Sequence, residues 1–148
     1  MLVVATPSHR RAFGAALRRA GIDTGEVRRA GLYTCLDAAA VMNTMAGDSE
    51  ISWRAFDRNA GELVRNLRMR GPLRVYGEIV NLMWMSGNRK AAIDLEMLWN
   101  RLRARVDFEL LCAYGIDAHG SDFAIGAAEG IIRTHTSVVP YGSGDSSH

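Results

Sequence analysis

Residues 74–115 read RVYGEIVNLMWMSGNRKAAIDLEMLWNRLRARVDFELLCAYG, and their pattern indicates the fold class. It opens on an apolar segment around Val75, continues through two helical patterns, and closes on a second apolar segment at 108–113. Two strands joined by a helical connection run parallel, because a tight hairpin joins only antiparallel neighbours. The sequence therefore predicts an α/β fold of three layers, with a mainly parallel sheet flanked by helices.

The same alternation of strands and helices extends over the rest of the chain. Further strands are predicted at 2–5, 32–36 and 136–139. Further helices are predicted at 7–20, 38–45, 52–69 and 123–133. Between the first helix and the second strand, 22–30 reads as a short polar connector. We expect one domain over 1–140, followed by a flexible tail over 141–148 that is rich in Gly and Ser.

The composition is that of an ordinary globular protein. Of the 148 residues, 48% are hydrophobic and 23% are charged, and the formal net charge is +2. This small charge argues against direct nucleic-acid binding. The apolar runs are far shorter than the roughly 20 residues of a membrane-spanning helix. No basic leader precedes the first apolar segment, so the cytoplasm is the expected compartment.

Polar and aromatic side chains follow several of the predicted strands. Ligands of open parallel sheets bind outside the carboxyl ends of the strands, where loops and helix starts converge. We therefore expect a ligand site at that edge. Its candidate residues are Thr6, His9, Asp37, Tyr76, Glu78 and Tyr114.

Glu78 is the most informative of these candidates. A carboxylate at a helix start is stabilised by free backbone amides and the helix dipole, and Gly77 would let the chain turn sharply before it. A purely structural role as a helix N-terminal acid explains Glu78 equally well. Asp37 has a similar alternative, since it precedes a predicted helix and would cap it. Trp84 and Tyr114 could line an apolar ligand pocket, or fill the core.

Sequence motifs for catalysis and cofactor binding are absent. The chain has no GxxxxGK[ST] phosphate-binding loop, no GxGxxG pattern and no GxSxG elbow. His9 and His135 each lack a second ligand at metal-type spacing. Cys35 and Cys112 have no CxxC partner, which indicates reduced thiols rather than a zinc site or a disulfide. We expect no catalytic residue, no metal and no cofactor.

Several sequence blocks together resemble one known family. They are 3–9 (VVATPSH), 31–32 with 36–38, 74–80 (RVYGEIV), 95–100 (LEMLWN), 112–114 (CAY) and 135–136. In this order and spacing they are similar to the MEDS domain, the methanogen/methylotroph sensory domain. The resemblance implies a degenerate relative of the RecA/KaiC-type fold without a P-loop. It also implies a small-molecule ligand, and signalling proteins such as histidine kinases or transcription regulators as partners.

One departure from the family pattern concerns the first strand. Family members usually carry another strand, loop and helix before the segment that matches 3–6. The resemblance therefore implies that the sheet either lacks a strand or is completed by another subunit.

Three functions remain open from the sequence. The first is a non-catalytic sensory domain that binds a small molecule or partner protein and regulates a bacterial signal-transduction or transcription pathway. The second is a residual nucleotide-binding or hydrolytic domain, with Glu78 as general base. The third is a structural homo-oligomeric module, in which an exposed first strand pairs with another chain.

Overall fold

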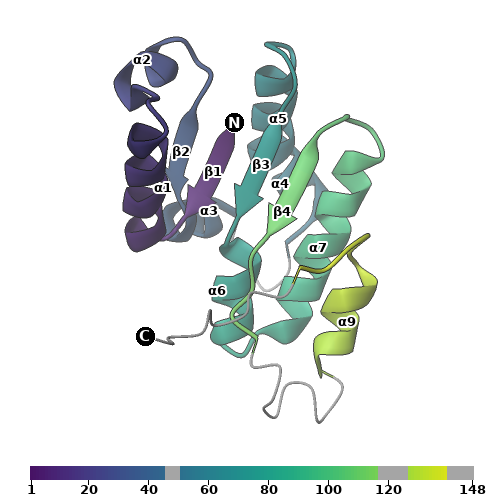
Figure 1. Cartoon of the computed structure of the whole chain (residues 1–148). Coiled ribbons are helices and arrows are strands. Elements are labelled where there is room, and N and C mark those ends of the chain that lie inside the picture. The colour runs from purple at the N-terminus through teal and green to yellow at the C-terminus, as the bar shows by residue number, and fades with distance from the viewer. Residues whose placement is uncertain (46–50, 117–126, 140–148) are drawn as a thin grey trace, which may run out of the picture. The chain divides into compact units, whose positions relative to one another are not determined.

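Four parallel strands form the sheet in the computed structural model, which describes residues 1–45, 51–116 and 127–139 (Figure 1). The strands are β1 (Leu2–Ala5), β2 (Thr34–Asp37), β3 (Arg74–Gly77) and β4 (Glu109–Cys112), and their order in the sheet is β2-β1-β3-β4. Every neighbouring pair is parallel, and helices flank the sheet. The predicted α/β fold of three layers is confirmed.

β1 is an interior strand. Val3 pairs with Cys35 of β2 on one side and with Tyr76 of β3 on the other. All four residues of β1 are buried. The expectation of an exposed first strand is therefore wrong, because both of its edges are already paired within the chain. Among the described strands, β2 and β4 lie at the ends of the sheet order.

The sheet order explains the layers on either side. From β1 the chain moves to β2 in one direction and then returns past β1 to β3 in the other. Right-handed crossovers in opposite directions place their helices on opposite faces. Val3, Ala5 and Tyr33 accordingly form one core cluster, with Phe13 and Leu17 packed against it.

The helices on this face are α1 (Pro7–Arg19) and α2 (Thr24–Arg29). Pro7 occupies the first turn of α1, where its missing N–H costs nothing. The side chain of Asp23 caps α2 by accepting hydrogen bonds from the N–H groups of Gly25 and Glu26. The prediction of an irregular polar connector at 22–30 is therefore wrong. Most of this segment forms α2, a short surface helix whose polar residues face solvent.

The second crossover contains α3 (Ala38–Met45), α4 (Trp53–Phe56), a π-helical turn (Asp57–Gly61) and α5 (Glu62–Arg68). Ser52 accepts a hydrogen bond from the N–H of Ala55 at 3.2 Å, which confirms the predicted start of the helix. The π turn inserts into the predicted helix 52–69 without ending it. Such turns are rare, and apolar spacing alone did not predict this one.

Between β3 and β4 lie α6 (Ile79–Met85) and α7 (Arg89–Arg103). Trp99 of α7 meets Phe56 of α4 edge to face, with ring centroids 5.0 Å apart, and Phe108 at 6.2 Å. Leu95 and Leu102 of α7 are fully buried. The apolar stripe of α7 therefore forms core, as its helical spacing indicates.

The chain divides into two compact units, 1–115 and 116–148. In the second, α9 (Ala127–Arg133) is described, and the expected helix residues 123–126 lie outside the described residues, as does the expected tail at 141–148. The strand expected at 136–139 is wrong: these residues form no regular element, and the side chains of Val138 and Val139 are 58% and 83% exposed. Short apolar runs become strands only where a neighbour pairs with them. None of the described helices is long and apolar enough to cross a membrane.

Candidate functional site

The carboxyl ends of β1 and β3 lie side by side at the point where the strand order reverses. From β1 the chain first moves toward β2, and later continues from β3 toward β4. In open parallel sheets this switch point is where the connecting loops separate and ligands bind. Thr6 follows β1 and Glu78 follows β3, so both residues emerge there.

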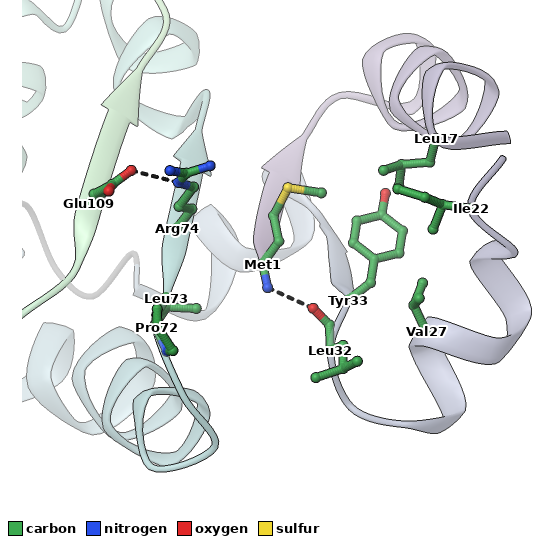
Figure 2. A pocket seen from close by; sticks show the side chains of 10 residues that line it. All are labelled: Met1, Leu17, Ile22, Val27, Leu32, Tyr33, Pro72, Leu73, Arg74 and Glu109. Carbon is green, nitrogen blue, oxygen red and sulfur yellow. Dashed lines mark hydrogen bonds and ion pairs between the residues drawn. The ribbon is translucent and has the colours of Figure 1, made fainter. Parts of the chain in front are cut away.

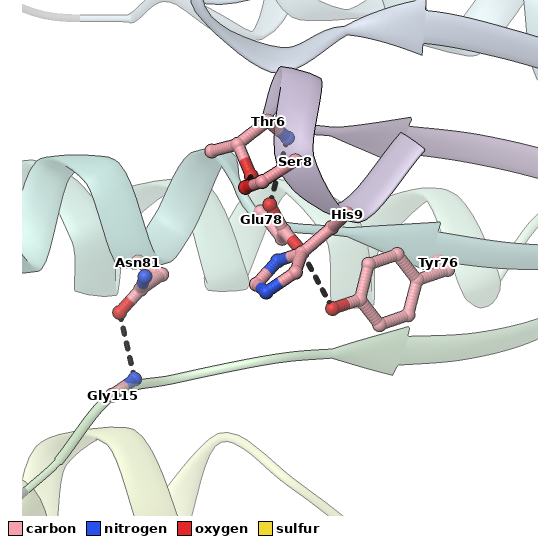
Figure 3. Close-up of polar contacts among 7 residues, drawn as sticks. All are labelled: Thr6, Ser8, His9, Tyr76, Glu78, Asn81 and Gly115. Carbon is pink, nitrogen blue, oxygen red and sulfur yellow. Dashed lines mark hydrogen bonds and ion pairs between the residues drawn. The ribbon is translucent and has the colours of Figure 1, made fainter. Parts of the chain in front are cut away.

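Glu78 joins the two strand ends by hydrogen bonds (Figure 3). Its Oε2 accepts the backbone N–H of Thr6 at 2.8 Å, and its Oε1 accepts the Tyr76 hydroxyl at 2.7 Å. Nδ1 of His9 contacts the same Oε1. Glu78 itself is only 2% exposed. We call Thr6, His9, Tyr76 and Glu78 the Glu78 network.

The ionisation of the network follows from these contacts. Burial opposes the charged form of Glu78, but the hydrogen bonds from Thr6, Tyr76 and His9 outweigh it and lower the pKa of the carboxyl below its ordinary value. Burial and the adjacent Glu78 carboxylate raise the pKa of Tyr76. At neutral pH the network therefore combines a buried carboxylate with a protonated tyrosine donor.

The outer surface of the network is polar and accessible. The His9 side chain is 61% exposed, although its ring contacts a buried carboxylate. The Thr6 and Ser8 hydroxyls lie 3.3 Å apart beside it. The first turn of α1 contains no acidic residue, but the Glu78 carboxylate accepts the N–H of its N-cap residue Thr6 and so places a negative charge at the positive end of the helix dipole. A ligand atom approaching this edge would meet His9 and the two hydroxyls first.

Gly77 does not produce a sharp turn, contrary to the sequence-based expectation. It is the last residue of β3, and its backbone is not among the glycines with positive φ. A Cβ built at Gly77 would meet no atom within 4 Å. The chain reaches Glu78 along the continuing strand direction, where the Glu78 N–H donates to the carbonyl of Val4 at 3.0 Å.

Two of the predicted site residues bond to other partners. The carboxylate of Asp37 pairs with the Arg10 guanidinium at 2.9 Å and accepts the N–H of Ala40 at 3.0 Å. Asp37 therefore caps α3, as its alternative interpretation predicted. The Tyr114 hydroxyl donates to Oε1 of Glu96 at 2.7 Å, so it serves a second buried carboxylate.

Glu96 was not predicted as a site residue. It is 1% exposed on α7, and it lies on the same helix face as Ala92, Leu95 and Trp99. Burial, together with the Glu96 charge, raises the pKa of both Cys112 and Tyr114. A carboxylate within an apolar helical stripe was the signal that could have identified this residue, since buried acids need partners.

The comparison with known families identifies the chain. The family described as MEDS, the MEthanogen/methylotroph, DcmR Sensory domain, matches residues 1–136. This protein belongs to the MEDS family. No curated protein and no solved structure matches the chain. The match confirms the resemblance seen in the sequence blocks, while the relationship to RecA and KaiC stays a prediction.

A half-open pocket of about 450 Å³ lies at the amino-terminal ends of the strands in this MEDS domain (Figure 2). The residues around it come from the starts of the strands, the end of α1 and the segments around α2. They are Met1, Leu17, Ile22, Val27, Leu32, Tyr33, Pro72, Leu73, Arg74 and Glu109. The sequence did not predict this pocket, because its apolar residues are individually typical of a core.

Proposed function

We propose that this MEDS domain is a non-catalytic sensory module that binds a small molecule at the Glu78 network. The observation that carries the proposal is a buried carboxylate that joins the ends of two central strands to an exposed histidine. A group bound at His9 would compete for the contact that His9 makes with Glu78. Binding outside the sheet would thereby alter hydrogen bonds between β1 and β3.

Signalling requires that the ligand distinguish two conformations. A ligand shifts such an equilibrium only by the difference between its affinities for the two states. The Glu78 network offers two hydrogen-bonding arrangements, one with His9 on the carboxylate and one with His9 on the ligand. We propose that this change is passed to a signalling protein such as a histidine kinase or transcription regulator.

Hydrolysis is the less favoured alternative. A general base needs a free lone pair and a pKa near the working pH. Thr6, Tyr76 and His9 engage the Glu78 oxygens, and their hydrogen bonds lower the pKa of the carboxyl. The sequence also lacks the phosphate-binding loop that a nucleotide would need. These observations favour binding over bond cleavage.

Native mass spectrometry of the purified full chain tests the proposal. We expect the wild type to retain a small-molecule adduct, and His9→Ala to lose it because the exposed contact is gone. Arg11→Ala is the matched control, since Arg11 is an exposed residue of the same helix. It should keep the adduct. A wild type without adduct, or an adduct that survives His9→Ala, would count against a ligand site at this network.

A further inference from the structure

A tryptophan and two arginines form a surface that shares no residue with the Glu78 network. Trp53 begins α4, Arg101 lies in the last turn of α7, and Arg105 follows that helix. The guanidinium carbons of Arg101 and Arg105 lie 4.2 and 4.8 Å from the centroid of the Trp53 ring. Both arginines are exposed, and Trp53 is partly buried. We call these three residues the Trp53 patch.

The Trp53 patch is held in place by the core beneath it. Trp53 contacts Phe56, with ring centroids 5.9 Å apart, and Phe56 is fully buried against Trp99 of α7. At the end of α7, Nη1 of Arg105 donates a hydrogen bond to the carbonyl of Arg101 at 3.2 Å. These contacts restrict the three side chains before any partner arrives. A partner that binds them therefore loses less affinity to the ordering of side chains.

The two positive charges of the patch are not neutralised within the described part of the chain. The described acidic residues that follow Trp53 and Arg105 are Asp57 and Asp107, and each already pairs with another arginine, at 2.7 and 3.1 Å. Neither arginine of the patch takes part in an ion pair among the described residues. Two guanidinium groups on one indole ring repel each other. An anionic group between them would replace this repulsion by attraction.

The chemistry of the patch fits an acidic segment of a protein. Guanidinium groups form paired hydrogen bonds with carboxylates, and Trp and Arg contribute much of the binding energy at protein interfaces. Met97 lies one turn before Arg101 on the same face of α7, and it is 60% exposed. It offers apolar contact that a phosphate backbone does not use. Nucleic acid fits less well, because the whole chain has a net charge of only +2.

We propose that the Trp53 patch binds an acidic segment of a partner protein. Carboxylates of the segment pair with Arg101 and Arg105, and an apolar side chain of the segment contacts Met97. The proposal goes beyond the function assigned to the Glu78 network, because it places a protein interface on a different surface. The two proposals are tested by different variants, so failure of either leaves the other standing.

Two pentapeptides with blocked ends separate charge from apolar contact. The first has the sequence EELEE, and its neutral counterpart is QQLQQ. We would titrate each into the isotope-labelled full chain at low salt and follow the indole N–H resonance of Trp53 by NMR, assigned with Trp53→Phe. We expect EELEE to shift this resonance and to bind at least tenfold tighter than QQLQQ. Raising the salt concentration should weaken EELEE, because exposed charges are screened.

Variants with matched charge locate the interface. Arg101→Gln combined with Arg105→Gln should weaken EELEE about tenfold, as the loss of two exposed ion pairs gives. Arg18→Gln combined with Arg19→Gln removes the same charge from the exposed end of α1, and it should change the affinity less than twofold. An unchanged indole resonance of Trp99 shows that each variant is folded.

Three results would overturn the proposal. The first is that EELEE leaves the Trp53 resonance unmoved. The second is that the α1 variant weakens EELEE as much as the patch variant does, since attraction would then be general to positive charge. The third is that hexathymidylate, a single-stranded DNA probe, shifts the Trp53 resonance with higher affinity than EELEE, which would assign the patch to nucleic acid.

Discussion

At the scale of single residues, Glu78 determines how the ends of β1 and β3 are held together. Its carboxylate accepts a backbone N–H from Thr6, which belongs to one strand end, and the hydroxyl of Tyr76, which belongs to the other. The sequence predicted six residues at one edge of the sheet, because parallel strands bring their carboxyl ends together. Four of them (Thr6, His9, Tyr76 and Glu78) are joined by hydrogen bonds, whereas Asp37 and Tyr114 bond to other partners. The sequence did not predict which of them bond, because those contacts depend on side-chain geometry.

We predict that Glu78→Gln lowers the free energy of unfolding by about 2 kcal/mol at neutral pH, the usual cost of leaving a buried partner unsatisfied. The amide retains one acceptor oxygen but places a donor where Thr6 or Tyr76 donates. Urea denaturation measures the change. Glu109→Gln is the matched control, because the Glu109 side chain is 72% exposed and its loss should change stability by about 0.5 kcal/mol or less. Equal effects in the two variants would contradict the assigned role of Glu78.

The contribution of Glu78 should depend on pH. Its pKa in the folded protein is lowered from the ordinary 4.5, so the folded state binds the proton less readily than the unfolded state. The contribution is therefore fully present above about pH 4.5, and is lost as the pH falls through the lowered value. We expect the stability difference between wild type and Glu78→Gln to shrink in acid. A difference that grows below pH 4.5 would show that the sign of the shift is wrong.

At the scale of elements, hydrophobic periodicity predicted the strands and helices that are strongly buried. It failed for elements whose formation depends on local contacts such as a helix cap. β1 is buried throughout and was predicted with its observed bounds. The helix α2 was missed because it buries no residue fully and depends on the Asp23 cap. The strand expected at 136–139 failed for the opposite reason, because its valines are apolar but exposed. Apolar composition alone does not specify strand pairing.

We predict that Asp23→Ala destabilises the protein by about 1 kcal/mol, the usual cost of losing a side-chain N-cap. Asp23 accepts two backbone hydrogen bonds, and the carbonyl of Val27 in α2 accepts the N–H groups of Leu32 and Tyr33 before β2. Fraying of α2 should therefore reach the start of β2. Urea denaturation measures the loss.

Asp94→Ala provides the control for this variant. Asp94 makes an exposed i,i+4 pair with Lys90 at 2.6 Å, and such pairs contribute about 0.3–0.5 kcal/mol. A cost for Asp23→Ala no greater than that of the control would show that the cap is dispensable.

At the scale of the whole molecule, the strand order determines where the proposed ligand site lies. Sequence periodicity predicted the parallel sheet, but local patterns do not determine which strands become neighbours. The interior position of β1 puts the switch point beside Thr6 and Glu78. Because β1 already pairs with β2 and β3, it has no free edge through which two copies of the chain could associate. A sensory role follows from the MEDS family, and the ligand and the signalling partner remain our proposals.

We predict no magnesium-dependent ATP hydrolysis by the full chain, because no phosphate-binding loop is present in the sequence and the oxygens of Glu78 are engaged. Phosphate release in the presence of ATP and Mg²⁺ is the measurement. Turnover that Glu78→Gln abolishes would restore the hydrolytic alternative.

We propose that ligand binding acts on the Glu78 network, and hydrogen exchange followed by mass spectrometry can measure this effect. The protein is compared as purified and after its retained ligand has been removed by dialysis from mild denaturant. We predict faster exchange without ligand in the peptides that contain Thr6 and Glu78, and no change around Glu109. Unchanged exchange at Thr6 and Glu78, with changes confined to residues 27–33, would contradict the claim.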